Sequence, residues 1–364
     1  MANNTTLSFD TLVTIDELQH IIPVYGPELT LVVQSEPGCG KSSIHYDLKA
    51  KLGDDEWDHI YIDCALKDVG DIAMSIPSHV TKKMEQYISS LFDFENGKKK
   101  LVMLDEFMKS PKLLQVMWTR LMLERCVGDR KLPEGSIVFA TSNNQSDGVG
   151  DTMLAHAGNR VCIVRMRKPD HVAWNLWATK YKISAVIRAW VAMNTKALAS
   201  YLELDEKELA ENTYIFNPKR PQLSFVSPRS LAKSDVIVRN KSFAGENMTK
   251  AALAGTIGKS AAESMAAFIS LESELLSTKD VLKDPDGVKL PEKTAAVVMM
   301  LFNAVDELQI QDDLTAFMKF LQRIGSREME AIFFTMLVQN KRTVKLAMNN
   351  KTISDWARTN IELF

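Results

Sequence analysis

The chain has 364 residues, which is enough for two or three structural units. Its 46% hydrophobic and 25% charged residues fit a protein with a large buried core, and its formal net charge of -2 does not favour a dedicated nucleic-acid binder. No run of about 18 apolar residues occurs and the first ten residues lack a signal pattern, so we expect a cytoplasmic protein that does not enter a membrane.

The cysteines and histidines predict neither a disulfide framework nor a zinc site. The four cysteines lie far apart and lack C-x-x-C spacing, and the six histidines form no pair or Cys/His cluster. We therefore expect reduced thiols that act as small core residues or bystanders, as is usual in a reducing compartment. The cysteines are Cys39, Cys64, Cys126 and Cys162.

Five short apolar runs in the first half of the chain predict buried strands. Their continuous rather than alternating apolar character is typical of a parallel sheet that is covered on both faces. Helices are expected at 41–52, ending at Gly53, and from Pro111, with Ser110 as its N-cap. Strands alternating with helices predict a doubly wound α/β domain over 1–168. The five strands are expected at 30–34, 59–64, 100–105, 136–142 and 160–166.

After Lys168 the sequence becomes helical. Asp170 and Ser184 are expected to cap two helices, a stretch at 202–223 is irregular, and another helix is expected from Pro228. We expect a helical domain over 169–248. An all-α region should follow over 249–364, interrupted by a loop at 283–293.

A glycine-rich segment, "LVVQSEPGCGKSS" at 31–43, lies between the first strand and the first helix. Gly38 and Gly40 allow consecutive N–H groups to converge on an anion, and the helix N-terminus adds a partial positive charge. Lys41 would then reach the β- and γ-phosphates of ATP, and Ser42 would offer its hydroxyl to Mg²⁺. The expected cofactor-binding residues are Glu36, Pro37, Gly38, Cys39, Gly40, Lys41, Ser42 and Ser43.

This segment departs from G-x-x-x-x-G-K-[ST] in one position, because Ser35 replaces the first glycine. We expect Ser35 to supply only a compatible turn and no functional side chain. The alternative interpretation of the whole segment is an ordinary glycine-rich turn.

The second motif, "KLVMLDEF", ends an apolar strand in two acids. Asp105 at the tip of the strand could hold Mg²⁺ through water, and Glu106 could act as general base toward an attacking water. Two adjacent acids are common by chance, but they are less so some 60 residues after a phosphate loop.

Three further polar positions are candidates. The strand in "SIVFATSNN" would carry Asn143 or Asn144 to the sheet edge, where an amide could orient the water. Arg160 precedes the last strand and could face a neighbour's γ-phosphate, and Arg229 begins a helix of the second domain. An Asn-rich turn and surface arginines are the alternatives.

In their order these motifs resemble the AAA+ ATPases, most of all the MoxR branch and its relatives called dynein-related AAA ATPases. The resemblance spans 35–231. It is carried by "EPGCGKS", "DEFMKSPKLLQVMWTRLMLERCVGDRKLPEG", "IVFATSNNQSD", "GNRV" and "FVSPRS".

The resemblance implies a P-loop AAA+ core with a five-stranded parallel sheet, a helical lid and a hexameric ring. It makes Asn143 the sensor that touches the water, Arg160 the finger acting across the subunit boundary, and Arg229 the lid sensor. It also implies a hairpin within 123–136 and a pore-facing insert at 69–77. Asn144, where relatives often carry Arg, and the absence of the usual Leu before Asn159-Arg160 are departures.

The leading hypothesis is an ATP-driven ring that remodels a protein client. The resemblance implies a von Willebrand factor A domain partner on a separate chain. A nucleic-acid motor or loader is an alternative, for which the sequence offers only the basic run Lys98 to Lys100. A slowly hydrolysing nucleotide-binding scaffold is a third hypothesis, motivated by Ser35 and Asn144.

Overall fold

The computed structural model describes residues 11–144, 159–220, 222–272, 275–360 and 362. The chain divides into two compact units, Met1–Lys168 and Pro169–Phe364. No helix among these residues is both long and apolar enough to span a bilayer.

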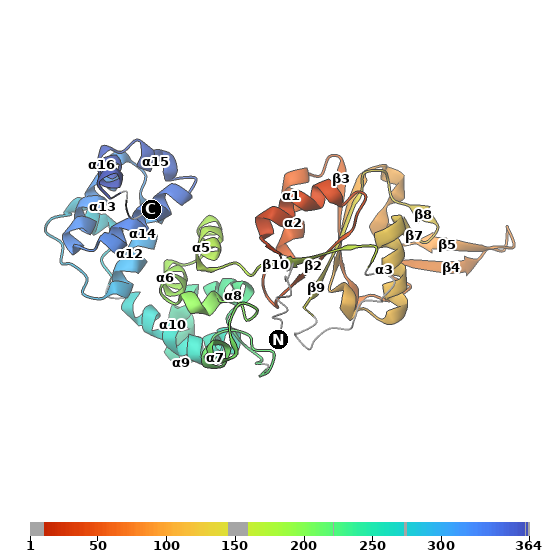
Figure 1. Cartoon of the computed structure of the whole chain (residues 1–364), viewed down its shortest axis with the longest axis horizontal. Coiled ribbons are helices and arrows are strands. Elements are labelled where there is room, and N and C mark those ends of the chain that lie inside the picture. Colours follow the sequence, from red (N-terminus) through yellow and green to blue (C-terminus); the bar gives the residue numbers. More distant parts are fainter. Residues whose placement is uncertain (1–10, 145–158, 221, 273–274, 361, 363–364) are drawn as a thin grey trace, which may run out of the picture. The chain divides into compact units, whose positions relative to one another are not determined.

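The first unit is built on a parallel sheet with the strand order β1-β10-β2-β9-β6-β3 (Figure 1). The predicted α/β fold class with a helical continuation is confirmed. The sheet has six strands rather than five. The extra strand, β1, has only two residues and no periodic pattern, so the sequence did not reveal it. The strands are β1 (Leu12–Val13), β2 (Leu31–Ser35), β3 (Trp57–Asp63), β6 (Lys99–Asp105), β9 (Ile137–Asn143) and β10 (Cys162–Met166).

Both faces of the central strands β2, β6 and β9 are buried, because alternate residues of these strands enter separate cores. On β2, Val32 packs in the core that contains Trp118 of α3 (Lys112–Glu124). Its neighbour Val33 packs in the other core. There it joins Leu18 of α1 (Ile15–Tyr25) and Ile44 of α2 (Ser43–Leu52). The apolar runs are continuous for this reason.

Helix starts differ slightly from the prediction. The helix α2 begins at Ser43 rather than Lys41, because Lys41 and Ser42 form a turn. In α3 the N-cap is Pro111, and Ser110 donates its hydroxyl to the Phe107 carbonyl instead of capping the helix.

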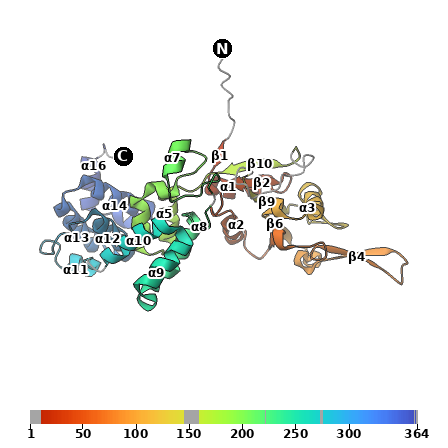
Figure 2. The same cartoon turned by 90° about the horizontal axis from the view of Figure 1, so that it is seen from below.

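Two antiparallel hairpins extend the first unit. The strands β4 (Ala73–Pro77) and β5 (Met84–Ile88) form the longer one, which projects away from the sheet (Figure 2). The strands β7 (Cys126–Val127) and β8 (Arg130–Lys131) form the second. The predicted hairpin within 123–136 is therefore present.

Among its described residues the second unit contains helices and no strand, with one large apolar core and a smaller cluster of Tyr201, Leu209, Ile215 and Phe216. The 3-10 turns aside, its helices are α5 (His171–Lys180), α6 (Ala185–Met193), α7 (Glu206–Glu211), α8 (Pro228–Arg239), α9 (Lys241–Ile257), α10 (Lys259–Leu271), α11 (Thr278–Lys283), α12 (Thr294–Glu307), α13 (Gln311–Ile324), α14 (Arg327–Gln339), α15 (Val344–Met348) and α16 (Lys351–Thr359). The prediction of an irregular stretch at 202–223 is wrong in part, because a short helix, Glu206–Glu211, lies within it.

Asp170 caps α5 as predicted, by accepting a hydrogen bond from the Ala173 N–H. Ser184 precedes α6 but does not cap it, because its hydroxyl donates to Asp235 instead. The predicted boundary between 248 and 249 falls inside α9, so the division into a lid and an extension stays a prediction.

Candidate functional site

The glycine-rich loop joins the end of β2 to the start of α2, at the carboxyl edge of the sheet. Gly38 and Gly40 have φ angles of 75° and 98°, which favour glycine at both positions. The N–H groups of Gly38, Gly40 and Ser42 donate no hydrogen bond within the described part of the chain. Unused amides beside a helix N-terminus are suited to hold an anion such as a polyphosphate.

Lys41 is buried beneath this loop, where it is 5% exposed. Its Nζ donates to the Asn143 Oδ1 at 2.8 Å, and to the Ser35 carbonyl, the Ser35 hydroxyl and the Glu36 carbonyl at 3.2 Å each. The ammonium is thus held by neutral acceptors at the strand edge. The expectation that Ser35 contributes no side chain is wrong, because its hydroxyl helps to position Lys41.

Strand register explains how distant residues meet at this edge. Ser35 of β2 lies opposite Asn143 of β9, and β9 lies between β2 and β6. On the other side of β6, Asp105 pairs in register with Asp63 of β3. Parallel strands end at one edge, so the loop, Asn143 and the acids are gathered there.

Asp105 is 6% exposed and accepts three side-chain hydrogen bonds. Ser42 Oγ donates to its Oδ2 at 3.0 Å, Tyr61 also donates to Oδ2, and Thr141 donates to Oδ1. Burial, together with the Asp105 carboxylate, raises the pKa of Tyr61, which therefore remains a donor. The Ser42 hydroxyl and the Asp105 carboxylate form an oxygen donor set of the kind that Mg²⁺ prefers.

Tyr61 and Thr141 were not predicted as site residues. Each places a hydroxyl next to apolar residues of its strand, and this is a weak signal because β3 and β9 contain other polar residues as well. Their contact with Asp105 depends on strand order, which no local pattern encodes.

Glu106 has a left-handed backbone with φ of 51°, which is unusual for a residue with a side chain. Its carboxylate is 34% exposed and forms an ion pair with Lys109 Nζ at 2.7 Å. Its N–H donates to the Thr141 hydroxyl at 3.4 Å. The sharp turn directs the chain away from the sheet immediately after Asp105, so two successive acids have different surroundings.

The two asparagines also differ. Asn143 contacts Lys41 directly, whereas Asn144 is buried with 7% exposure. Lys41, predicted to bind phosphate, is thus hydrogen-bonded to the residue predicted as sensor.

A buried ion pair joins the loop to the last residue of the first unit. Glu36 Oε2 lies 3.7 Å from Lys168 Nζ, and the two side chains are 4% and 3% exposed. The sequence contained no sign of this pair, because its members are far apart in the chain.

Of the two predicted arginines, Arg160 lies away from this cluster and Arg229 lies in the second unit. Arg160 is exposed in a turn before β10. Because Cys162 pairs with Leu31, this turn lies at the amino edge of the sheet, opposite the edge that carries the loop. Arg229 lies in the first turn of α8 in the second unit. Neither role is tested by these positions.

The basic run at 98–100 is used internally. Lys100 has 0% exposure and pairs with Asp58, Lys98 donates to the Asp54 carbonyl, and Lys99 lies over the Trp57 ring. Lys100 is therefore withdrawn from the surface, whereas Lys98 is half-buried and Lys99 is exposed.

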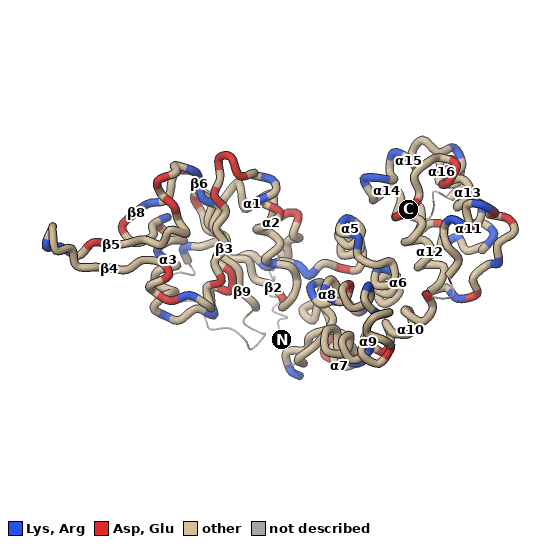
Figure 3. The backbone as a smooth tube through the Cα atoms, turned by 180° about the vertical axis from the view of Figure 1, so that it is seen from behind, with Lys and Arg blue, Asp and Glu red and all other residues tan. Residues whose placement is uncertain are grey.

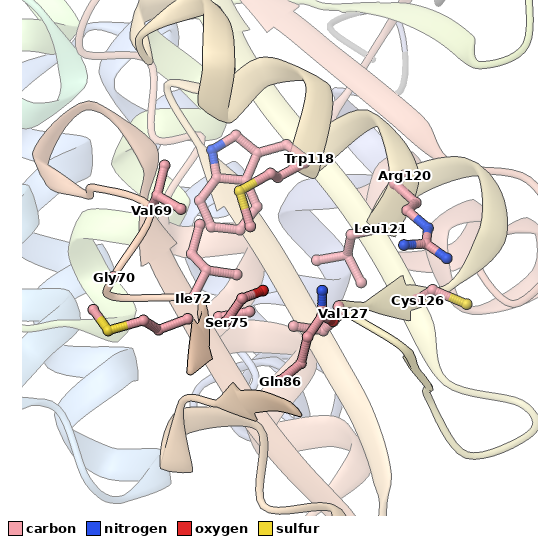
Figure 4. A pocket seen from close by; sticks show the side chains of 14 residues that line it. Val69, Gly70, Ile72, Ser75, Gln86, Trp118, Arg120, Leu121, Cys126 and Val127 are labelled. Carbon is pink, nitrogen blue, oxygen red and sulfur yellow. The ribbon is translucent and has the colours of Figure 1, made fainter. Parts of the chain in front are cut away.

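The two hairpins enclose a hollow of about 530 Å³ with α3 (Figure 4). Ser75 and Gln86 of the long hairpin, Trp118 and Leu121 of α3, and Val127 of the short hairpin line it. A Cβ on Gly128 would lie 2.6 Å from Gln86 Oε1, so the hairpins approach closely. The insert and the hairpin implied by the resemblance are therefore adjacent.

No family model matches the sequence, and no curated protein matches it. Solved structures are similar at low identity. A RuvB variant from Thermotoga maritima is 12% identical, with 74% of this chain and 73% of RuvB covered and a TM-score of 0.36. NtrX from Brucella abortus, in complex with ATP, is 11% identical, with 90% and 69% covered and a TM-score of 0.36. Similarity of this extent assigns neither a family nor an activity to the chain.

Proposed function

We propose that the chain is a Mg²⁺-dependent ATPase of the AAA+ class, from its MoxR-like branch. One observation carries the proposal. Lys41 and Asn143 on one side, and Ser42 and Asp105 on the other, form hydrogen-bonded pairs directly beside a loop with unused amides. This set of donors and acids suits phosphoryl transfer, in which positioning and charge stabilisation dominate.

In this proposal each residue has one task. The loop amides and Lys41 bind the polyphosphate, and Ser42 and Asp105 would hold Mg²⁺. When bound, Mg²⁺ would neutralise charge on the phosphate oxygens. Glu106 accepts a proton from the attacking water and Asn143 orients that water. In this structure Lys41 donates a hydrogen bond to Asn143. If Lys41 turned toward a bound phosphate, Asn143 would lose this hydrogen-bond partner.

We further propose a ring, of which a hexamer is the expected form. Arg160 lies at the sheet edge opposite its own loop, so it could serve only the site of another copy. An arginine supplied in this way contributes about 10³- to 10⁵-fold in rate in related chemistry. Arg229 would report the nucleotide state from the second unit.

The hairpins are proposed to contact a protein client. Met74, Ile76, Met84 and Tyr87 are exposed on the long hairpin, at 52%, 40%, 63% and 59%. Exposed apolar side chains on a projecting element are suited to transient protein contacts. A cytoplasmic partner with a von Willebrand factor A domain is proposed to deliver the client.

The test is Glu106→Gln, measured as phosphate release and as binding of a fluorescent ATP analogue. We expect turnover to fall about 100-fold or more while binding is retained, since only the proton acceptor is removed. The matched control is Glu134→Gln, at an exposed acid outside the site. Wild-type turnover in Glu106→Gln would refute the assigned base.

The unaltered protein separates the remaining alternatives. Background turnover with ATP still bound would favour a nucleotide-binding scaffold. Stimulation of turnover by single-stranded or duplex DNA that weakens steeply with salt would favour a nucleic-acid motor.

A further inference from the structure

The second unit contains a groove that is lined by residues of that unit. Its volume is about 970 Å³. The helix α5 packs on α6, α6 on α12, and α12 on α14 (Figure 1). Residues of α5 and α14 line the two sides, and residues of α6 and α12 line the space between them. The groove therefore has two helical walls and an interhelical floor.

One complete face of α5 forms the first wall. Its lining positions recur at helical spacing and span nine residue steps, or about 14 Å of helix. Val172 and Leu176 are apolar members of this face and are 42% and 41% exposed. The lining positions are His171, Val172, Asn175, Leu176, Thr179 and Lys180.

One complete face of α14 forms the second wall. Its positions span eleven residue steps, or about 16 Å, so the groove extends along both helices. Met336 is a flexible apolar side chain that adapts to different partners. The lining positions are Glu328, Ala331, Ile332, Thr335, Met336 and Gln339.

The floor is mainly apolar and the rim is basic. Ala192, Phe302 and Val305 form the floor. Asp306 also lines the groove, but its carboxylate is neutralised by an ion pair with the buried Arg188 guanidinium.

The rim carries Lys180, Lys182, Lys341 and Arg342 against one further acid, Glu328. None of these four cations forms an ion pair with an acid among the residues that the structure describes. In Figure 3 basic positions lie on α5 and beside α14. A partner with acidic side chains would therefore complement this rim.

We propose that this groove binds an amphipathic helix of a partner protein. Apolar side chains at i, i+3, i+4 and i+7 fill the space above Phe302 and Val305, and Asp or Glu on the flanks contact Lys180, Lys182 and Lys341. A helix of about 12 residues matches the length of the walls. The proposal does not depend on ATP hydrolysis, because the groove lies within the second unit.

The test uses the full chain and a fluorescein-labelled, stapled helical peptide of about 12 residues, with leucine on one face and glutamate on the flanks. Fluorescence anisotropy should show saturable binding. The same peptide with lysine in place of glutamate should bind about tenfold more weakly. No saturable binding of the acidic peptide, or equal affinity for both peptides, would overturn the proposal.

Variants locate the binding. Leu176→Glu should weaken binding of the acidic peptide about tenfold, because it places a charge among the apolar contacts. The double variant Lys180→Glu, Lys341→Glu should reverse the preference between the two peptides. Matched controls are Val236→Glu, at a residue that is 66% exposed outside the groove, and Lys279→Glu on α11. Equal effects of the groove and control substitutions would refute the assignment.

Labelling distinguishes the other occupants. We expect the thiol of Leu176→Cys to react with maleimide in the free protein and to be protected by the acidic peptide. Protection without peptide would overturn the proposal. If dilution removed that protection the occupant would be a second copy, and otherwise a segment of the same chain.

Discussion

The two units bury polar side chains in different ways. In the first unit Lys41, Asp105 and Thr141 converge at the common edge of neighbouring strands. In the second unit, two polar groups with 0% exposure bond to nearby backbone: the Ser234 hydroxyl donates to the Ser230 carbonyl and Thr343 to the Leu337 carbonyl.

This difference follows from the geometry of the elements. Parallel strands bring unrelated segments together at one edge with unused backbone groups nearby, whereas helices satisfy many hydroxyls locally and pair only some polar groups across the core, as Arg188 does with Asp306. We therefore propose a contrast between the first unit, which would carry the nucleotide site, and the second unit, which has the large helical core and the proposed groove. Substitutions in each unit test this contrast.

The largest effect is expected from Phe333→Ala in the second unit. Phe333 is fully buried, and its ring centroid lies 5.0 Å from that of Phe317. Its truncation should lower the free energy of unfolding by about 3–5 kcal/mol, measured by urea denaturation. ATP affinity below the unfolding transition should not change. Phe243→Ala, at a residue that is 91% exposed, is the control, and a loss of ATP affinity in the folded Phe333→Ala protein would break the contrast.

Lys41→Met, in contrast to Phe333→Ala, should change the affinity for ATP rather than the free energy of unfolding. The substitution removes a charged donor at the phosphate loop and should weaken ATP binding about 100-fold, as measured by titration with a fluorescent analogue. Lys49→Met, at a half-exposed lysine of α2 that pairs with Asp54, should bind ATP normally. If Lys41→Met and Lys49→Met bound the ATP analogue with equal affinity, Lys41 would not belong to the nucleotide site.

Acid sensitivity should be partly a property of the first unit. Burial lowers the pKa of His45 to about 4 from 6.5, with a smaller contribution from His59. The unfolded chain then binds the extra proton first, so the stability that this neutral group contributes is present above pH 6.5 and is lost as the pH falls toward 4.

Between pH 7 and pH 5 this loss amounts to about 2 kcal/mol. The variant His45→Phe should show a correspondingly smaller loss in urea denaturation at the two pH values. His20→Phe, at a surface histidine, is the control. An unchanged pH dependence in His45→Phe would contradict the assignment.

The smallest effect is expected from Tyr61→Phe. Tyr61 donates to Asp105, the carboxylate proposed to hold Mg²⁺, and removal of a hydrogen-bond partner of a metal ligand weakens metal affinity. We expect the Mg²⁺ concentration needed for half-maximal binding of the ATP analogue to rise about fivefold, with metal-free binding unchanged. Tyr46→Phe, at an exposed tyrosine of α2, is the control. If Tyr61→Phe and Tyr46→Phe showed the same Mg²⁺ dependence, Tyr61 would contribute to packing and not to metal binding.

Local sequence patterns predicted the strands and the loop because each depends on adjacent residues. Apolar runs located β2, β3, β6, β9 and β10, and the glycine spacing located the phosphate loop. The same patterns missed β1, whose two residues carry no period.

The patterns also missed the partners of the site. Ser35, Tyr61 and Thr141 contribute hydroxyls that became visible only through strand register. The buried Glu36–Lys168 pair joins residues that are remote in the chain. For Arg160 and Arg229 the assigned roles remain predictions, since they require a second copy or the second unit.

The amino-acid sequence by itself determined the order of elements and which residues can carry the chemistry. Periodicity, capping and glycine placement act over a few residues and are readable locally. The tertiary structure decided that β9 lies between the loop and the acids, that Lys41 rests on Ser35 and Asn143, and that two helices leave a groove between them. Those outcomes depend on contacts between distant segments, whose energies no short stretch of sequence contains.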